Sequence, residues 1–532
     1  MADASRKVAL AGSERRPLAG AVAIGRTRPD EVIQVTLKLR RRQALSVAAA
    51  QATPMTRAEL AAAYGAAPAD IAQAAAAVEA LGLRVVSTDQ ATRSVIVAGP
   101  VSAMEAAFDI QLFDYRHPDG GYRGRVGALR LPAELDGVVV GVFGLDNRRV
   151  ARRRHHPARD AAAAAVAGRA PAQFAQRYNF PPGDGAGQTV GLLEFGGGYF
   201  PADLAQFCGL AGVAAPPTVT ALSVDGAQTN AHDGEEGEVM LDIEVVAGVC
   251  PKASIVVYFA AWTEAGWIAA LDKALQDGAN DPGVISISWG AAEDTDIWST
   301  QAMTQINEAL KEAIALRITV CVAAGDDGSS DAVLDGHAHV DFPGSSPLTL
   351  AVGGTTIPAA GADVAWKIGT GLRAPNGAAT DGSTGGGVSA IFPREAWQSA
   401  VTVVSVNPGA IVGRCVPDLA ANADWSASPY LLVVDGQAQG NGGTSAAAPL
   451  VASLIARLNA ARTAAGKPRA GYVTPLLYQA QGGAALGASA CTPVLAGDNV
   501  TSAAGGYHAG AGYNAVGGWG VPNGGALLRL LP

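Results

Sequence analysis

Histidine and cysteine are scarce in this chain of 532 residues, which has seven of the first and five of the second. The cysteines are odd in number and show no C-x-x-C spacing, so the sequence predicts neither a disulfide framework nor a zinc site. Charged residues make up only 16% of the chain and the net charge is −9, which disfavours nucleic acid as a partner. No apolar stretch reaches about 18 residues, and residues 1–30 lack the apolar core of a secretory signal, so neither a membrane span nor a signal peptide is expected.

Apolar residues are abundant instead, at 49% of the total, which in a chain of this length is enough for more than one domain with its own core. From about residue 166, short apolar runs alternate with segments of helical spacing. This alternation predicts an α/β domain with a mostly parallel sheet covered by helices on both faces. The strands are expected at residues 188–194, 254–259, 284–289, 318–324 and 348–353.

The first third of the chain has a different organisation. A basic, then Ala-rich segment without periodicity occupies residues 148–168 and predicts an exposed linker. The pattern before it indicates a compact α+β domain over residues 1–147, and the α/β domain would fill residues 169–532. Its elements are expected at residues 32–39, 56–63, 67–81, 83–88, 93–98 and 100–107, with a hairpin through 117–121.

The octapeptide Gly442–Pro449 predicts a tight turn that starts a helix of small residues, with Ser445 in its first turn. The N-terminus of a helix offers unpaired N–H groups and the positive end of the dipole, which would stabilise an oxyanion formed beside this hydroxyl. Ser445 is therefore a candidate nucleophile. Taken alone, the motif is equally consistent with a capping turn in front of a packing helix.

A nucleophilic serine needs a base, and the histidines do not offer one. His232, His337, His339 and His508 lie in Gly- and Asp-rich segments, where exposed loop histidines are expected. Carboxylates are better placed.

An apolar helix starting at Gly237 or Glu238 would carry Glu238 and Asp242 at i and i+4, on one face and close enough to share a proton. Acidic residues in a first turn more often only complement the helix dipole, but in a helix this apolar the two carboxyls would be buried.

Two predicted strands end in further candidates. Asp326 follows Ala-Ala-Gly at the carboxyl end of a buried strand, where open α/β sheets place their sites. A protonated aspartate there could donate a hydrogen bond to an oxyanion, which suits an enzyme that works in acid. Trp289 ends a second strand and is either a core aromatic or a partner of the carboxylates.

At this point the sequence resembles the sedolisins, or serine-carboxyl peptidases, and among them the kumamolisin-like members. The matching motifs follow one another in the family's order: Glu238-x-x-x-Asp242, Ser-Trp-Gly at 288–290, Ala-Ala-Gly-Asp at 323–326, Ser-Thr-Gly-Gly-Gly-Val-Ser at 383–389 and Gly-Gly-Thr-Ser-Ala at 442–446. The resemblance implies that Ser445 is the nucleophile, Glu238 its general base and acid, Asp242 the carboxylate that orients Glu238, and Asp326 the oxyanion-hole acid. Glu194 matches a glutamate that extends this carboxyl network in the family. Trp289 also has a counterpart there.

The resemblance also implies a fold: a subtilisin-like, doubly wound, mostly parallel sheet, preceded by a ferredoxin-like α+β prodomain that inhibits the enzyme until the linker is cut. It further implies an extracellular, monomeric endopeptidase acting on polypeptides in acid, with no membrane or nucleic-acid partner and no cofactor for the chemistry. Residues near the substrate would be Ser288, Gly290, Gly385, Gly386, Gly387 and Asp341.

One departure concerns calcium, which sedolisins hold near the C-terminus. Pro493 and Asn514 stand where the family has the two aspartates, so the site should be weak or lost. The positions that match the family's site are Pro493, Val494, Gly510, Gly512 and Asn514.

Two alternatives remain from the sequence. A subtilisin-type peptidase of neutral pH would need one of the histidines as its base. A binding protein on a sedolisin scaffold would not need the reacting residues, all of which are present.

Overall fold

The computed structural model describes residues 6–118, 120–150, 152–153, 156–157, 168–372 and 381–532, with residues 152–153 and 156–157 described by their backbone alone. Contacts divide the chain into two compact units. The first joins Met1–Ala151 with Ala261–Gly278 and Thr295–Leu316. The second comprises Arg152–Ala260, Ala279–Asp294 and Arg317–Pro532.

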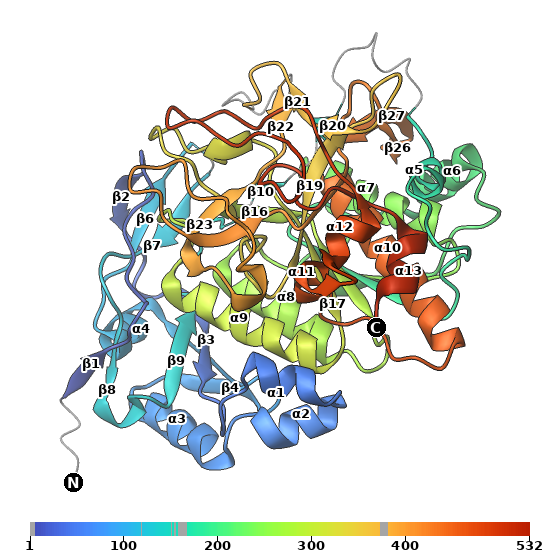
Figure 1. Cartoon of the computed structure of the whole chain (residues 1–532). Coiled ribbons are helices and arrows are strands. Elements are labelled where there is room, and N and C mark those ends of the chain that lie inside the picture. Colours follow the sequence, from blue (N-terminus) through green and yellow to red (C-terminus); the bar gives the residue numbers. More distant parts are fainter. Residues whose placement is uncertain (1–5, 119, 151, 154–155, 158–167, 373–380) are drawn as a thin grey trace. The chain divides into compact units, whose positions relative to one another are not determined.

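The first unit contains a four-stranded antiparallel sheet in the order β4-β5-β3-β9 (Figure 1). Ile33, Val35 and Leu37 alternate with more exposed neighbours along β3, as expected for a strand with one face on a core. Helices α3 and α4 pack against β5, which completes the predicted ferredoxin-like order of elements. These elements are β3 (Val32–Leu39), α2 (Arg57–Tyr64), α3 (Pro68–Ala80), β4 (Arg84–Asp89), β5 (Ser94–Pro100), α4 (Val101–Phe108) and β9 (Val139–Phe143).

Two helices from the middle of the sequence, α8 (Glu264–Gln276) and α9 (Thr300–Ala315), belong to the same unit. Each begins with a hydroxyl cap, from Thr263 and Ser299 respectively. Ion pairs join these helices to residues 1–148, with Lys38 Nζ 2.7 Å from an oxygen of Asp272. Shorter elements of this unit are β1 (Lys7–Ala9), β2 (Val22–Arg26), α1 (Val47–Ala52), β6 (Phe113–Arg116), β7 (Tyr122–Gly124) and β8 (Arg130–Pro132).

The second unit is built on an eight-stranded sheet in the order β13-β14-β12-β15-β17-β19-β20, with β25 also pairing with β19. All pairs are parallel except β19 with β20. The predicted parallel sheet is therefore confirmed, although β13, β20 and β25 were not expected. The strands are β12 (Thr189–Glu194), β13 (Val219–Ser223), β14 (Ser254–Phe259), β15 (Val284–Ile287), β17 (Thr319–Ala323), β19 (Leu350–Thr356), β20 (Val364–Ala365) and β25 (Leu419–Asn422).

Strand β12 lies where the winding of this sheet reverses. After β12 the chain forms β13 and then β14 on one side, and later β15 on the other, so the carboxyl end of β12 opens onto a topological switch point. Open parallel sheets bind their ligands at such points. The last residue of β12 is Glu194.

Two buried helices pack against this sheet. Helix α10 (Thr444–Ala464) contacts β15, β17, β19 and β25, and it also packs against α7 (Glu236–Val249). Helix α7 begins at Glu236, slightly before the expected start, because Gly237 is tolerated inside its first turn. Other elements are α5 (Pro171–Arg177), α6 (Pro201–Ala211), β16 (Trp289–Ala292), β18 (Asp341–Phe342), β23 (Gly387–Pro393), β24 (Gly413–Val416), β26 (Tyr430–Val434), β27 (Gln437–Gly442), α11 (Thr474–Tyr478), α12 (Leu486–Ala490) and α13 (Gly524–Leu530).

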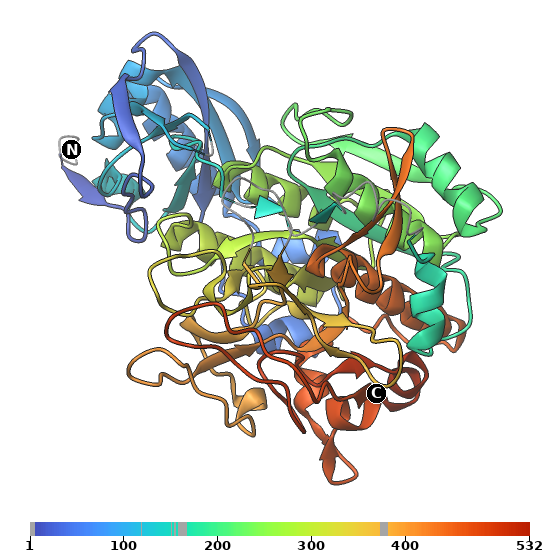
Figure 2. The ribbon, with the colours of Figure 1, turned by 90° about the horizontal axis from the view of Figure 1, so that it is seen from above.

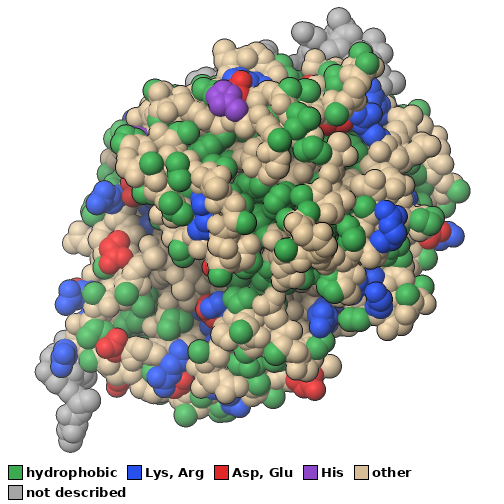
Figure 3. Space-filling model, viewed as in Figure 1, with side chains coloured by type: hydrophobic (Ala, Val, Ile, Leu, Met, Phe, Trp, Pro, Cys, Tyr) green, Lys and Arg blue, Asp and Glu red, His purple; other side chains and the backbone are tan. Residues whose placement is uncertain are grey.

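The cysteines are all free thiols in buried positions. Within the described residues, no helix is both long and apolar enough to cross a membrane. On the face drawn in Figure 3, lysine and arginine side chains lie scattered among acidic and uncharged ones.

Candidate active site

Helix α7 places two carboxyls inside the protein. Glu238 and Asp242 are one helical turn apart, and neither has measurable solvent exposure. The helix can carry them there because nearly all of its other residues are apolar and buried, so it is enclosed on every side.

Glu194, at the carboxyl end of β12, brings a third buried carboxyl to the same place. The carboxyls of Glu194 and Asp242 lie close enough for each to shift the pKa of the other. Trp289 Nε1 donates to Glu194 Oε2 at 2.9 Å, and its ring meets Phe195 edge to face. Trp289 is thus a partner of the carboxylates as well as a core aromatic.

Burial dominates the electrostatics of this carboxyl cluster, which comprises Glu194, Glu238 and Asp242. Desolvation, followed by repulsion from the Glu238 carboxylate, raises the pKa of Glu194 well above its ordinary value. Desolvation and repulsion from Glu194 and Glu238 do the same for the pKa of Asp242. The cluster therefore holds protons that exposed carboxyls would have lost, and it can pass a proton between its members.

Ser445 is the second residue of α10, and Gly443 makes the turn in front of it with φ of 100°. Ser445 Oγ donates to the carbonyl oxygen of Ser288 at 3.3 Å. Ser288 Oγ lies 2.7 Å from Asp242 Oδ2 and 3.2 Å from the carbonyl oxygen of Ser445. Ser288 therefore links the candidate nucleophile to the carboxyl cluster.

Asp326 lies in the turn after β17 and is fully buried. Its Oδ1 accepts from the Thr444 main-chain N–H at 2.9 Å and from the Thr444 hydroxyl at 2.6 Å. Asp326 is thus fixed directly beside the residue that precedes Ser445.

The glycine-rich segment at residues 385–387 runs along the same turn. The N–H of Gly385 donates to the carbonyl oxygen of Gly325 at 2.8 Å. A Cβ on Gly385 would lie 1.9 Å from the carbonyl oxygen of Ala324, so no larger residue fits. Gly386 and Gly387 have φ of 143° and 154°, and Gly387 begins β23.

Gly290 and Asp341 form a second close contact, where β16 pairs with β18. A Cβ on Gly290 would lie 1.8 Å from Asp341 Oδ1. Asp341 is almost fully buried, and one carboxyl oxygen also lies near Gly325. The structure therefore brings Asp341, Gly290 and the turn before Asp326 together.

The linker forms two short antiparallel strands beside these residues. In β10 (Arg152–Arg153), Arg152 pairs with Gly290 and Arg153 with Trp289 of β16, which Figure 1 labels beside it. In β11 (His156–Pro157), His156 pairs with Gly442 of β27. The other parts of the expected linker at residues 151, 154–155 and 158–167 lie outside the described residues.

Some buried polar residues near the site escaped the sequence reasoning. His339 was expected to be exposed, but it is 6% exposed, with Nδ1 2.6 Å from Asp294 and Nε2 3.0 Å from Asp335. Both ring nitrogens are therefore engaged with carboxylates, which does not suit a general base for Ser445. Residues 335–339 form no helix, so the spacing of Asp335 and His339 gave no signal in the sequence.

Glu293 follows β16 directly and is buried against β23. Its Oε1 accepts from the Ser389 hydroxyl and the Ala390 N–H, both at 2.7 Å. Glu244, two residues after Asp242 on α7, is also buried and accepts from the Val433 N–H at 2.8 Å. Both glutamates position strands that flank the site, and nothing in their spacing marked them.

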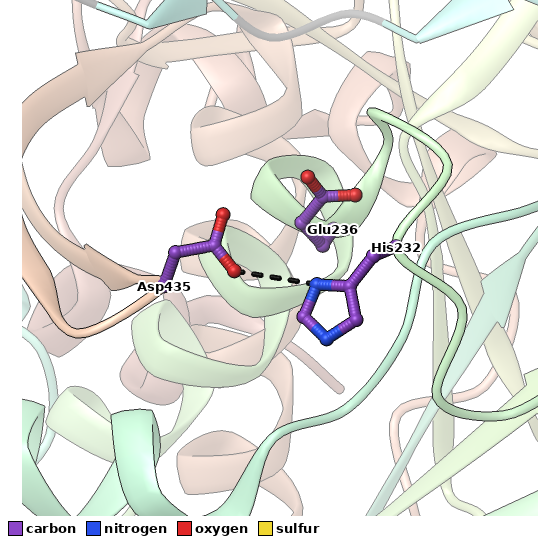
Figure 4. A group of neighbouring side chains, drawn as sticks. All are labelled: His232, Glu236 and Asp435. Carbon is purple, nitrogen blue, oxygen red and sulfur yellow. Dashed lines mark ion pairs between the residues drawn. The ribbon is translucent and has the colours of Figure 1, made fainter.

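One surface cluster has the side chains of a metal site. His232, Glu236 and Asp435 hold their ligand atoms within 4.8 Å of one another, and Figure 4 shows the imidazole turned toward Asp435. His232 Nδ1 lies 3.3 Å from Asp435 Oδ1, with both side chains more than half exposed. Exposed groupings of this kind are common without an ion, so we assign no metal here.

Comparison with known proteins places the chain in a family. Residues 19–148 match the family described as "Pro-kumamolisin, activation domain", and residues 223–479 match the "Subtilase family". The chain is 41% identical to kumamolisin of Bacillus sp. (strain MN-32) over 554 residues, covering 99% of this chain and 96% of the relative. It is 31% identical to sedolisin of Pseudomonas sp. (strain 101), covering 81% of this chain and 73% of that protein.

A solved structure of Pseudomonas sedolisin (serine-carboxyl proteinase) complexed with pseudo-iodotyrostatin is similar as well. It has a TM-score of 0.58 and 27% sequence identity, and covers 68% of this chain and 97% of that chain.

Proposed function

Because this chain belongs to the sedolisin family of serine-carboxyl peptidases, as a zymogen with an activation prodomain, we propose that it is an acid-active endopeptidase whose first substrate is its own linker. Peptidases of this type need no cofactor for their chemistry. The substrates would be polypeptides unfolded by acid, and the enzyme would act outside the cell as a monomer.

The observation that carries this proposal is the buried carboxyl cluster on α7 and β12, linked through Ser288 to Ser445. In the proposed reaction, Ser445 Oγ forms a bond to the substrate carbonyl carbon while its proton passes to Glu238. Glu238 then gives this proton to the leaving amine as the C–N bond breaks, which leaves an acyl-enzyme.

Water next attacks the acyl carbon, its proton passes to Glu238, and Ser445 recovers a proton as the acid product leaves. Asp242 orients Glu238 and tunes its pKa. Glu194 and Trp289 extend the network, so that protons can be redistributed among the three carboxyls without exposing them to water.

Asp326 is proposed to act as an acid in the oxyanion hole, with the N–H groups at the start of α10. Only the protonated carboxyl can donate, so activity should fall as Asp326 loses its proton. An Asp326→Asn variant keeps a donor at any pH, and we expect its activity to extend toward neutral pH. A variant that keeps the original upper pH limit would argue against this role.

The domain assignment is part of the proposal: a prodomain over 1–147, a linker over 148–168 and a peptidase domain over 169–532. The strand pairings of the linker support it. Arg152 and Arg153 lie opposite Gly290 and Trp289, and His156 lies opposite Gly442, so the two pairings approach Ser445 from either side. We therefore propose that the first self-cleavage falls between Arg153 and His156.

We also propose that substrates bind in the same way, as an extended strand between β16 and β27. Main-chain pairing of this kind holds any sequence, while pockets for alternate side chains give specificity. Ser288, Gly290 and Gly385–Gly387 would supply backbone and small side chains at the cleft, and Asp341 would lie near a specificity pocket.

The test is to acidify the purified full-length chain to about pH 4 and follow its intact mass beside a Ser445→Ala control. We expect a cut between Arg153 and His156 in the wild-type chain and none in the control. A Ser445-dependent cut elsewhere in the linker would support the peptidase activity but refute the cleavage position inferred from the strand pairings. The proposed activity would be refuted if the wild-type chain stayed whole like the control, and if it still failed to cleave an added denatured protein after pepsin had removed its prodomain.

A further inference from the structure

The C-terminal loop around Asn514 lacks the two carboxylate ligands of the calcium site that the family resemblance predicts. Calcium takes six to eight oxygen ligands, with carboxylates among them. Pro493 brings no side-chain oxygen, and Asn514 brings a neutral amide in place of a carboxylate. The residues at these positions therefore do not fit the ion.

The carboxamide of Asn514 is nearly buried, with 7% exposure, and it makes four hydrogen bonds. Its Nδ2 donates to the carbonyl oxygens of Gly510 at 3.0 Å and Val494 at 3.3 Å. Its Oδ1 accepts from the N–H groups of Gly517 at 2.8 Å and Val516 at 3.3 Å. Both donors and both lone pairs of the amide are thus used.

This pattern fixes which end of the amide is nitrogen. With the amide turned over, Oδ1 would face two carbonyl oxygens and the amino group would face two N–H groups. Every contact would then be repulsive. The two carbonyls that meet Nδ2, those of Val494 and Gly510, are at positions where the family is expected to bind calcium.

We propose that the Asn514 carboxamide takes the structural place of the calcium ion. It draws the carbonyls of Val494 and Gly510 together with two donated hydrogen bonds, and it fixes the turn at residues 516–517 with the other end. The main chain of Asn514 completes the contact, pairing with Gly518 at 2.9 and 3.2 Å. The loop is therefore closed without a metal.

The clamp formed by Asn514 supports residues near the candidate active site. Beyond Val494, the same loop reaches Asn499, whose Nδ2 donates to the carbonyl oxygen of Gly386 at 3.0 Å. The carbonyl of Asn499 accepts from the N–H of Ser329 at 2.7 Å, in the segment after Asp326. A loop that stayed closed without calcium would keep both segments in place under chelating conditions.

The experiment measures thermal unfolding near pH 7 in a Ser445→Ala background, which prevents self-digestion. We expect the same Tm in excess calcium and in EDTA. Asn514→Asp should lower the Tm by about 4 °C or more in EDTA, because a carboxylate would face the carbonyl oxygens of Val494 and Gly510 and lose both donated bonds. Asn230→Asp, at an exposed asparagine, is the matched control and should change little.

A double variant, Pro493→Asp with Asn514→Asp, tests whether amide and ion share one place. We expect calcium to raise its Tm by several degrees. A wild-type Tm that falls on chelation would overturn the proposal. The proposal would also be overturned by an Asn514→Asp variant as stable as its control, or by a double variant whose Tm does not change with calcium. None of these readouts depends on peptidase activity.

Discussion

Glu293 offers the sharpest test of how acid stabilises this fold. Burial, which outweighs the hydrogen bonds from Ser345, Ser389 and Ala390, raises the pKa of its carboxyl from 4.5 to about 7. The folded protein therefore binds a proton between about pH 4.5 and pH 7 that the unfolded chain has already released. The stability from this proton is fully present below pH 4.5 and is lost as the pH rises through 7.

The size of the effect follows from the pKa. One pKa unit corresponds to about 1.4 kcal/mol, so the rise at Glu293 costs about 3 kcal/mol of unfolding free energy above pH 7. The Glu293→Gln variant keeps an oxygen for the N–H groups of Ala390 and Ile391 and removes the titration. In a unit of this size we expect the variant to gain about 5 °C in Tm relative to the parent between pH 4.5 and pH 8.

The assay is a series of thermal unfolding curves across that pH range, in a Ser445→Ala background so that unfolded chain is not digested. Glu79→Gln, at an exposed glutamate, serves as the control for loss of one charge. If parent and Glu293→Gln lost stability in parallel as the pH rose, the carboxyl would have an ordinary pKa and the reasoning from burial would be refuted.

Two further predictions concern buried charges. Although burial opposes it, hydrogen bonding to Asp294 and Asp335 raises the pKa of His339 from 6.5 to about 9, so this stabilisation is present below pH 6.5 and lost as the pH passes 9. His339→Gln should therefore unfold more easily by up to about 2 kcal/mol at pH 6, allowing for partial solvent screening, and match the parent at pH 10; equal stability at pH 6 would contradict this. Asp272→Asn should destabilise the first unit by about 3–5 kcal/mol, measured by urea unfolding, because it leaves the ammonium of Lys38, 1% exposed, without its carboxylate. The double variant Lys38→Met with Asp272→Leu should recover most of that loss, and failure to do so would show that packing, not charge, is lost.

The fold was largely predictable because its strands have clear patterns. Continuous apolar runs gave β12, β14, β15, β17 and β19 within two residues of their observed starts. Strand β13 was missed because its residues are only partly buried at one edge of the sheet, where the apolar pattern fades. Strand β25 was missed because Leu419–Asn422 is short and half of it is alanine.

The candidate site was predictable only where the chemistry lies within one motif. The i, i+4 spacing of Glu238 and Asp242 placed both on one buried face, as observed. The link between Glu194 and Trp289 joins residues 95 positions apart, so no local pattern could give it, and the family resemblance supplied it. The hydrogen-bond partners of Asn514 were equally hidden, because they are main-chain carbonyl and N–H groups, which every sequence supplies.

The depth of α7 and α10 has a consequence for how activity is lost. Both helices are among the most enclosed elements of the second unit, and they pack against each other as well as the sheet. Segments with such cover exchange their amide hydrogens only through large-scale opening. The amides around Ser445 and Asp242 should therefore be among the slowest in the molecule to exchange, and heat should remove activity and tertiary structure in a single step. Changes in peptide preference would then be expected in β16 and β27, with which the linker pairs, while the proposed reacting groups stay fixed.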